Sequence, residues 1–192
     1  QLTKPAIVGH SLGAFMAFYL ASSAPDSIGT IIAVDGLPYL APVFSRDSST
    51  TVAQVTSQAE YFRTLYQGMN AEQLANMTTQ GVQIQATSAM HQQQVISMAA
   101  ASDARTVGQA LYELLTTDLR SEVHTIKSKV LLIGAGAALR NDAERTAVTE
   151  LYQQQIASVA NATLEFNYDS RHFIMLDQPD WLTARIANAL KD

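Results

Sequence analysis

Short apolar runs and longer amphipathic stretches alternate along the chain. The runs at 6–9, 29–36 and 129–136 show no polar alternation, which is typical of strands covered on both faces. A fourth run begins at Ala162 and alternates instead, so its apolar residues share one face of a predicted strand: Leu164, Phe166 and Tyr168. Four strands are therefore predicted.

Helical patterns follow three of these runs. Residues 12–24 predict a helix that Pro25 ends, and further amphipathic helices are predicted at about 143–159 and at 179–190. Strands that alternate with helices at these lengths favour a parallel sheet. The predicted fold class is α/β, with a mostly parallel sheet covered by helices on both faces.

The stretch 37–119 interrupts the alternation, because it contains helical patterns and turn signals but no convincing strand. Three apolar helical faces occur in it: Val52, Val55, Ala59 and Phe62; Val95, Met98 and Ala99; Val107, Ala110, Leu111 and Leu114. We therefore expect a core formed by residues 1–36 and 120–192, interrupted by a helical cap insertion at 37–119.

Composition narrows the classes of function. The 192 residues are 47% hydrophobic and 15% charged, which suits one folded domain with a substantial core. A formal net charge of −5 without any Lys/Arg cluster argues against nucleic-acid binding. The absence of cysteine excludes disulfides and thiolate catalysis, and no apolar run reaches the roughly 18 to 20 residues of a membrane span.

The stretch "PAIVGHSLGAF" carries the strongest chemical signal. It places G-x-S-x-G between a predicted strand and a predicted helix, the arrangement of a nucleophile elbow. Gly9 and Gly13 supply the small residues that a sharp turn requires, and backbone N–H groups at the helix start point to where negative charge develops on a reacting oxygen. Ser11 is the predicted nucleophile.

A serine hydroxyl needs a base, and histidine suits that task near neutral pH. His10 lies inside the elbow and is interpreted as a packing residue beneath the turn, while His91 and His124 lie in polar surroundings and are interpreted as solvated. His172, in "DSRHFIMLDQP", follows the last predicted strand, so it belongs to the same edge of the sheet as the elbow. It is the predicted base.

The order of "GHSLG", an α/β pattern, a helical insertion and "RHFIMLDQP" resembles the α/β-hydrolase fold superfamily, in particular bacterial esterase-like members with a helical cap. The resemblance covers nearly the whole chain. It implies a Ser-His-Asp triad with Ser11 as nucleophile and His172 as base, and the N–H of Leu12 as an oxyanion donor. It further implies a small-molecule acyl substrate such as an ester, and no metal or organic cofactor.

The acid of the triad has two candidates. In the resembling family it most often follows the strand after the cap, where the chain offers Asp142, although "NDAE" also reads as a helix start. Some members carry it after the strand before the cap, where Asp35 stands, and Asp35 is the favoured choice. Asp118 comes third, and Asp169 and Asp177 are interpreted as loop and capping residues.

Only "QLTK" precedes the first predicted strand, whereas the resembling family has several elements before the elbow. We therefore expect the C-terminal part of a longer hydrolase, with an open apolar edge that associates with the remaining segment or another chain. Two alternatives to an active enzyme remain: a catalytically silent member that binds a small molecule, and an inactive fragment of a longer hydrolase.

Overall fold

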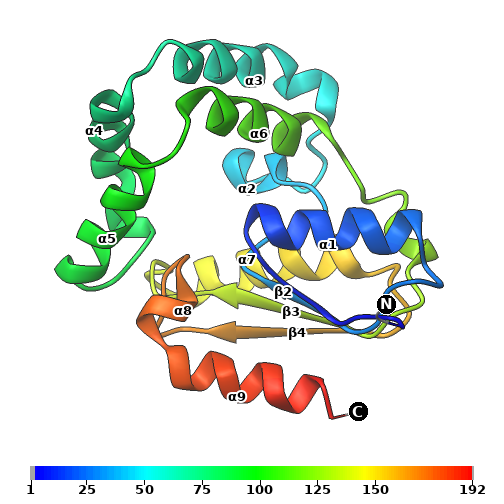
Figure 1. Cartoon of the computed structure of the whole chain (residues 1–192). Helices are drawn as coiled ribbons and strands as arrows, with labels where there is room; N and C mark the ends of the chain where they lie inside the picture. The colour runs from blue at the N-terminus through cyan, green and yellow to red at the C-terminus, as the bar shows by residue number, and fades with distance from the viewer. Residues whose placement is uncertain (1–2, 192) are drawn as a thin grey trace.

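Four parallel strands form the centre of the structure, a computed structural model that describes residues 3–191 (Figure 1). Their order in the sheet is the order of the chain: β1 (Ile7–His10), β2 (Ile31–Val34), β3 (Val130–Ala135) and β4 (Ala162–Asn167). The carboxyl ends of the strands therefore lie along one edge of the sheet, where the loops that follow them can meet.

Helices cover both faces of this sheet. On one face lie α1 (Leu12–Ser23) and α7 (Asp142–Ile156), and on the other lie the short α8 (Ile174–Asp177) and α9 (Pro179–Ala189). Successive strand residues point to opposite faces, and both faces are apolar, so β2 and β3 are continuous apolar runs. The predicted fold class, a mostly parallel α/β sheet covered on both faces, is confirmed.

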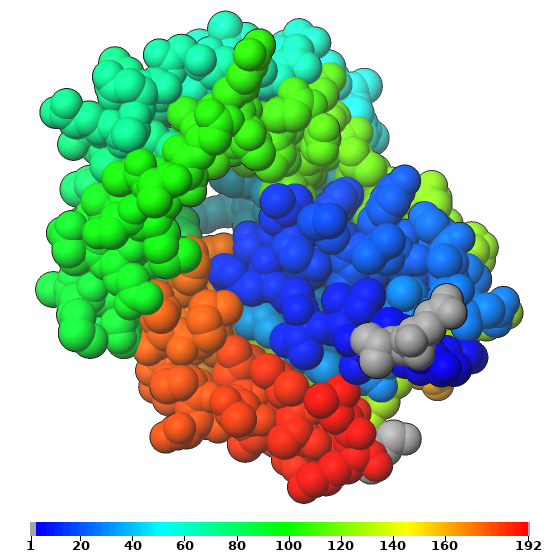
Figure 2. All heavy atoms as spheres, in the orientation of Figure 1, coloured from blue at the N-terminus to red at the C-terminus, as the bar shows by residue number. Residues whose placement is uncertain are grey.

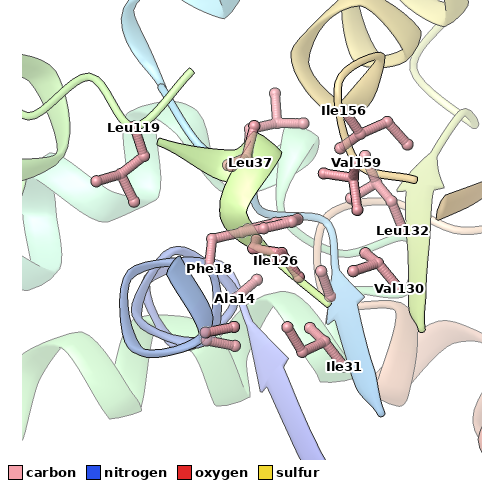
Figure 3. Packing of buried hydrophobic residues seen from close by; sticks show 14 of the residues in the cluster. Ala14, Phe18, Ile31, Leu37, Leu119, Ile126, Val130, Leu132, Ile156 and Val159 are labelled. Atoms are coloured by element: carbon pink, nitrogen blue, oxygen red, sulfur yellow. The ribbon is translucent and has the colours of Figure 1, made fainter. Parts of the chain in front are cut away.

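The two core clusters show this alternation directly. Ile31 and Leu132 pack with Phe18 of α1 and Ile156 of α7, as Figure 3 shows from close by. Their neighbours in the strands point the other way and pack against α8 and α9; these are Ile32, Val34, Leu131 and Ile133.

Between β2 and β3 the chain forms helices. They are α2 (Ala41–Ser45), α3 (Val52–Gln67), α4 (Ala71–Gly81), the 3₁₀ turn η1 (Val82–Ile84), α5 (Ala89–Ala100) and α6 (Ala104–Thr116), with the 3₁₀ turn η2 (Val123–Thr125) before β3. Residues 41–116, here called the helical segment, arch over the carboxyl edge of the sheet (Figure 1). Helix α4 was not predicted because its run is largely polar; Asn70 and Gln73 begin it with a reciprocal capping box.

Two contacts fix the ends of the helical segment to the core. The side chain of Gln155 in α7 accepts from the backbone N–H of Tyr39 (2.9 Å) and donates to its carbonyl (2.7 Å). At the other end Arg120 pairs with Asp118 (2.6 Å) and lies over the Tyr39 ring, 4.7 Å from its centroid. The buried bonds of Gln155 and the partly buried pair of Arg120 and Asp118 define where the segment leaves and rejoins the core.

Strand β1 lies at an edge of the sheet and pairs only with β2 among the described residues. Val8 of β1 is 49% exposed, and the outer side of α1, whose helix lies at the surface in Figure 2, carries further exposed apolar side chains: Leu12, Met16, Tyr19 and Leu20. These five residues are called the open apolar face below. Within residues 3–191 no helix is long and apolar enough to cross a membrane.

Candidate active site

Ser11 lies in the sharp turn that joins β1 to α1. Its backbone adopts φ 54° and ψ −115°, a conformation that costs an L-residue on the order of 1–3 kcal/mol. The turn is held because the N–H of Ser11 donates to the carbonyl of Val34 (2.9 Å) and its own carbonyl accepts from Ala14 (3.0 Å) and Phe15 (3.1 Å). Strain held in place by surrounding hydrogen bonds is typical of a functional turn.

Glycine is required at two positions around this turn, and one of them differs from the sequence expectation. A Cβ on Gly9 would collide with the backbone of Gly13, and a Cβ on Gly36 would collide with the carbonyl of Ser11. A Cβ on Gly13 would meet open space instead. One close approach therefore lies within the elbow, at Gly9, and the other lies between the elbow and the loop after β2, at Gly36. The expectation that Gly13 must be small for steric reasons was wrong.

Asp35 and His172 are joined by a short hydrogen bond. The Nδ1 atom of His172 lies 2.7 Å from Oδ2 of Asp35, and the two side chains are 25% and 10% exposed. The other carboxylate oxygen, Oδ1, accepts from the backbone N–H of Ala135 (3.0 Å) and from the hydroxyl of Tyr152 (3.1 Å). Since both oxygens of Asp35 are occupied, the carboxylate is fixed in position, and its bond to Nδ1 leaves Nε2 of the imidazole for other chemistry.

Tyr152 was not anticipated from the sequence. Burial raises the pKa of its hydroxyl well above the usual value, and the neighbouring charge of Asp35 acts in the same direction. The hydroxyl therefore stays protonated and donates to Asp35. The sequence does not indicate this contact with Asp35. Tyr152 lies within α7, and only tertiary packing brings α7 beside the end of β2.

The other candidate acids lie elsewhere. Asp142 begins α7 with a fully exposed side chain, 3.6 Å from Arg145, and Asp118 pairs with Arg120. Asp169 is exposed. Of the acids weighed from the sequence, Asp35 is the one that the structure brings to His172.

His10 does more than pack beneath the elbow. Its Nε2 lies 2.9 Å from the carbonyl oxygen of His172, and its ring lies against those of His172 and Phe173, with centroids 4.5 and 4.9 Å away. Burial, followed by the nearby charge of His172, lowers the pKa of His10 to about 4. The imidazole is therefore neutral near pH 7 and donates its Nε2 proton to a carbonyl that can only accept.

Asp177 and His91 also differ from their sequence interpretations. The Asp177 side chain is only 2% exposed, and it accepts from the backbone N–H (3.0 Å) and hydroxyl (2.7 Å) of Thr87 and from the backbone N–H of Arg171 (2.9 Å). His91, expected to be solvated, lies 3.4 Å from the same carboxylate. Asp177 therefore joins the start of α5 to the loop that carries His172. His124 is exposed, as expected.

Two backbone hydrogen bonds reinforce this junction. The N–H groups of His172 and Phe173 donate to the carbonyls of Ile84 (3.4 Å) and Gln85 (2.8 Å), which lie in and just after η1. Phe173 also packs with apolar residues of the helical segment, Val82, Ala86 and Val95. The helical segment and the His172 loop are thus held together by polar and apolar contacts.

A cavity of about 600 Å³ lies between the core and the helical segment, and it includes Ser11, Leu12, Asp35 and His172 among its lining residues. The helical segment supplies a mostly apolar wall: Val43, Phe44, Tyr66, Val107, Ala110, Leu111 and Leu114. Figure 2 shows the molecule hollowed between the helices of this segment and the start of α1. Such a cavity suits an apolar small molecule with a few polar groups.

The N–H group of Leu12 and the hydroxyl of Ser11 bear on the chemistry of this cavity. The N–H of Leu12 belongs to the first turn of α1, where helical N–H groups have no partner within the helix. Within residues 3–191 no hydrogen bond joins Ser11 Oγ to the His172 ring, which is bonded through Nδ1 to Asp35. Bonds between a nucleophile and its base are often long before the substrate binds. Nowhere in residues 3–191 do three or more acidic or histidine side chains gather as metal ligands would.

A sequence model of the Alpha/beta hydrolase family matches residues 1–185. The chain belongs to this alpha/beta hydrolase family. A search of curated proteins finds no matching sequence.

Solved structures share the fold of this alpha/beta hydrolase at low sequence identity. MenH from S. aureus is 15% identical with a TM-score of 0.74, over 97% of this chain and 67% of its own. An esterase from Exiguobacterium antarcticum is 18% identical with a TM-score of 0.74, over 100% and 68%. A bromoperoxidase from Bacillus anthracis is 15% identical with a TM-score of 0.68, over 100% and 68%. The chain spans about two thirds of the length of these proteins, and the likeness concerns the fold.

Proposed function

We propose that this alpha/beta hydrolase cleaves an ester or a related acyl compound, with Ser11 as nucleophile, His172 as general base and Asp35 as the acid that orients the imidazole. The observation that carries the proposal is the 2.7 Å contact between Asp35 and His172 beside the strained turn that holds Ser11. A buried carboxylate on Nδ1 selects the tautomer whose Nε2 can accept a proton.

The reaction would proceed in two halves. The Ser11 hydroxyl oxygen attacks the carbonyl carbon while its proton passes to Nε2 of His172, and the oxyanion that forms accepts a hydrogen bond from the N–H of Leu12. The leaving alcohol departs with the proton from His172, which leaves an acyl-serine. Water then attacks the acyl group with His172 as base, and the acid and free Ser11 are released.

We further propose that residues 37–119 act as a cap that supplies the acyl-binding wall. The apolar lining from α2, α3 and α6 supports this assignment, because an apolar acyl chain loses unfavourable contact with water there. The cap would also displace water from this wall when the acyl group of the substrate binds.

The open apolar face supports a proposal about partners. Val8 and the exposed side chains of α1 adjoin an unpaired parallel strand, and exposed edges of this kind pair readily with further chain. We propose that an additional segment, from the same protein or another chain, packs against this face.

The activity is tested by labelling the purified protein with a fluorescent fluorophosphonate and by following the hydrolysis of short p-nitrophenyl esters. Labelling and turnover should both disappear in Ser11→Ala and persist in Ser23→Ala, a control at the exposed end of α1. Ester hydrolysis retained by Ser11→Ala would contradict the assignment of the nucleophile. An inert Ser11 combined with measurable affinity for a small ester would instead favour a ligand-binding member of the family.

A further inference from the structure

Arg171 stands directly before His172 and lines the same cavity as Ser11. Its backbone is fixed, because its N–H donates to the buried carboxylate of Asp177 (2.9 Å). The backbone from which the Arg171 side chain extends is therefore held in place beside the proposed base.

The guanidinium of Arg171 has no partner within the part of the chain that the structure describes, although Arg171 is partly buried. Its Nε atom is buried and makes no hydrogen bond. Arg46 and Arg105 are exposed to solvent, and the remaining arginines have a carboxylate or an aromatic ring as partner: Arg63, Arg120, Arg140, Arg145 and Arg185. A buried N–H of a charged group without a partner is costly, so a partner from outside the chain is favoured.

Among residues 3–191, none supplies the cavity with a free negative charge that could serve as this partner. Asp35 is the one acidic residue that lines it, and both of its oxygens are occupied by His172, Ala135 and Tyr152. Apart from Asp35, Arg171 and His172, the lining side chains carry no ionisable acid or base of ordinary pKa near 7, and most are apolar. Arg171 therefore adds a positive charge to the lining of a mostly apolar cavity.

We propose that Arg171 binds a carboxylate of the substrate, so that the preferred substrates are esters that carry a second, anionic carboxylate group. A guanidinium binds a carboxylate through two parallel N–H···O bonds, and an apolar wall strengthens such a pair by excluding water. The proposal rests on the proposed esterase function, since it assigns the substrate class of the same site.

Two matched ester pairs test this proposal, one for each side of the scissile bond. Monomethyl adipate and methyl hexanoate differ only by a carboxylate on the acyl part, and 3-acetoxybenzoate and 3-methylphenyl acetate differ only by a carboxylate on the leaving group. The wild type should prefer the anionic member of at least one pair in kcat/KM. Which pair shows the preference decides the side on which Arg171 binds.

Arg171→Gln should reduce that preference about 10- to 100-fold, mainly through KM, as expected for loss of a charged hydrogen bond. Turnover of the neutral esters should change little, Arg171→Lys should restore part of the preference, and the exposed control Arg105→Gln should leave it intact. Equal loss for neutral and anionic esters would assign Arg171 a structural role and overturn the proposal.

A binding measurement distinguishes failure of the proposed carboxylate site from failure of the proposed esterase function. In Ser11→Ala, calorimetry should show tighter binding of monomethyl adipate or 3-acetoxybenzoate than of the neutral ester of the same pair, and Arg171→Gln should abolish the difference. No anionic preference in binding overturns the carboxylate site, whatever the turnover. Absence of turnover and of fluorophosphonate labelling at Ser11, with the anionic preference intact, would contradict the esterase function alone.

Discussion

Protonation of His10 should destabilise the folded protein below pH 6.5. The imidazole is held neutral in the fold, where it donates from Nε2 to the carbonyl of His172. Burial, followed by the nearby charge of His172, lowers its pKa from 6.5 to about 4. An unfolded chain binds the proton at the ordinary pKa, so acid favours the unfolded state across this window.

The size of the effect follows from the two pKa values. A fall from 6.5 to about 4 corresponds to roughly 3 kcal/mol of unfolding free energy. The sign is that of a depressed histidine pKa: the contribution is fully present above pH 6.5 and is lost as the pH falls from 6.5 toward 4. Further acidification below the folded pKa changes this contribution little.

Urea denaturation at several pH values between 7.5 and 4 measures this loss. His10→Gln keeps an N–H donor but cannot titrate, so its unfolding free energy should fall by roughly 3 kcal/mol less than that of the wild type over the same range. His124→Gln, which removes an exposed histidine, is the control and should behave as the wild type. Equal pH dependence in wild type and His10→Gln, or a His10 NMR titration near 6.5, would refute the reasoning.

Three further predictions concern the elbow and the loop of the proposed base. Asp35→Asn should lower kcat by about 10³- to 10⁴-fold, as loss of the correct imidazole tautomer does in other triads, whereas Asp142→Asn should leave steady-state kinetics nearly unchanged. Asp177→Asn should lower the unfolding free energy by about 1–3 kcal/mol above pH 4 and reduce kcat, because the N–H groups of Thr87 and Arg171 lose a carboxylate acceptor. Urea denaturation measures this loss, with the exposed Asp180→Asn as the control. Hydrogen bonds outweigh burial and lower the pKa of Asp177, so its contribution should be lost as the pH falls through that folded value. Gly9→Ala should destabilise the elbow by more than 1 kcal/mol in thermal unfolding, since its Cβ meets the backbone of α1, and unchanged stability would contradict the close approach.

The periodicity of the sequence determined the main elements of the fold. The apolar run of β3 lies buried on both faces, and the long apolar pattern after Ser11 forms α1. Both patterns are local, so a strand or helix follows from the spacing of side chains alone. The G-x-S-x-G spacing likewise predicted the turn at Ser11, because its steric requirement lies within a few residues.

Contacts between distant segments could not be read in this way. Asp35 and Asp142 were both compatible with the sequence. The parallel order β2-β3-β4 puts Asp35, which follows β2, and the His172 loop, which follows β4, at the same edge of the sheet, where the two side chains meet, while Asp142 stays exposed. His10 provides a second case, since a bond between residues 162 positions apart has no local signal.

The sequence by itself therefore determined the class of fold, the elbow and the chain order of the serine and the histidine. The tertiary structure alone decided which carboxylate meets His172, that Asp177 is a buried junction with the helical segment, and that Arg171 lines the cavity without a partner. The physical reason is that spacing along the chain specifies local backbone geometry, whereas burial and partners of a polar side chain depend on which distant elements pack around it.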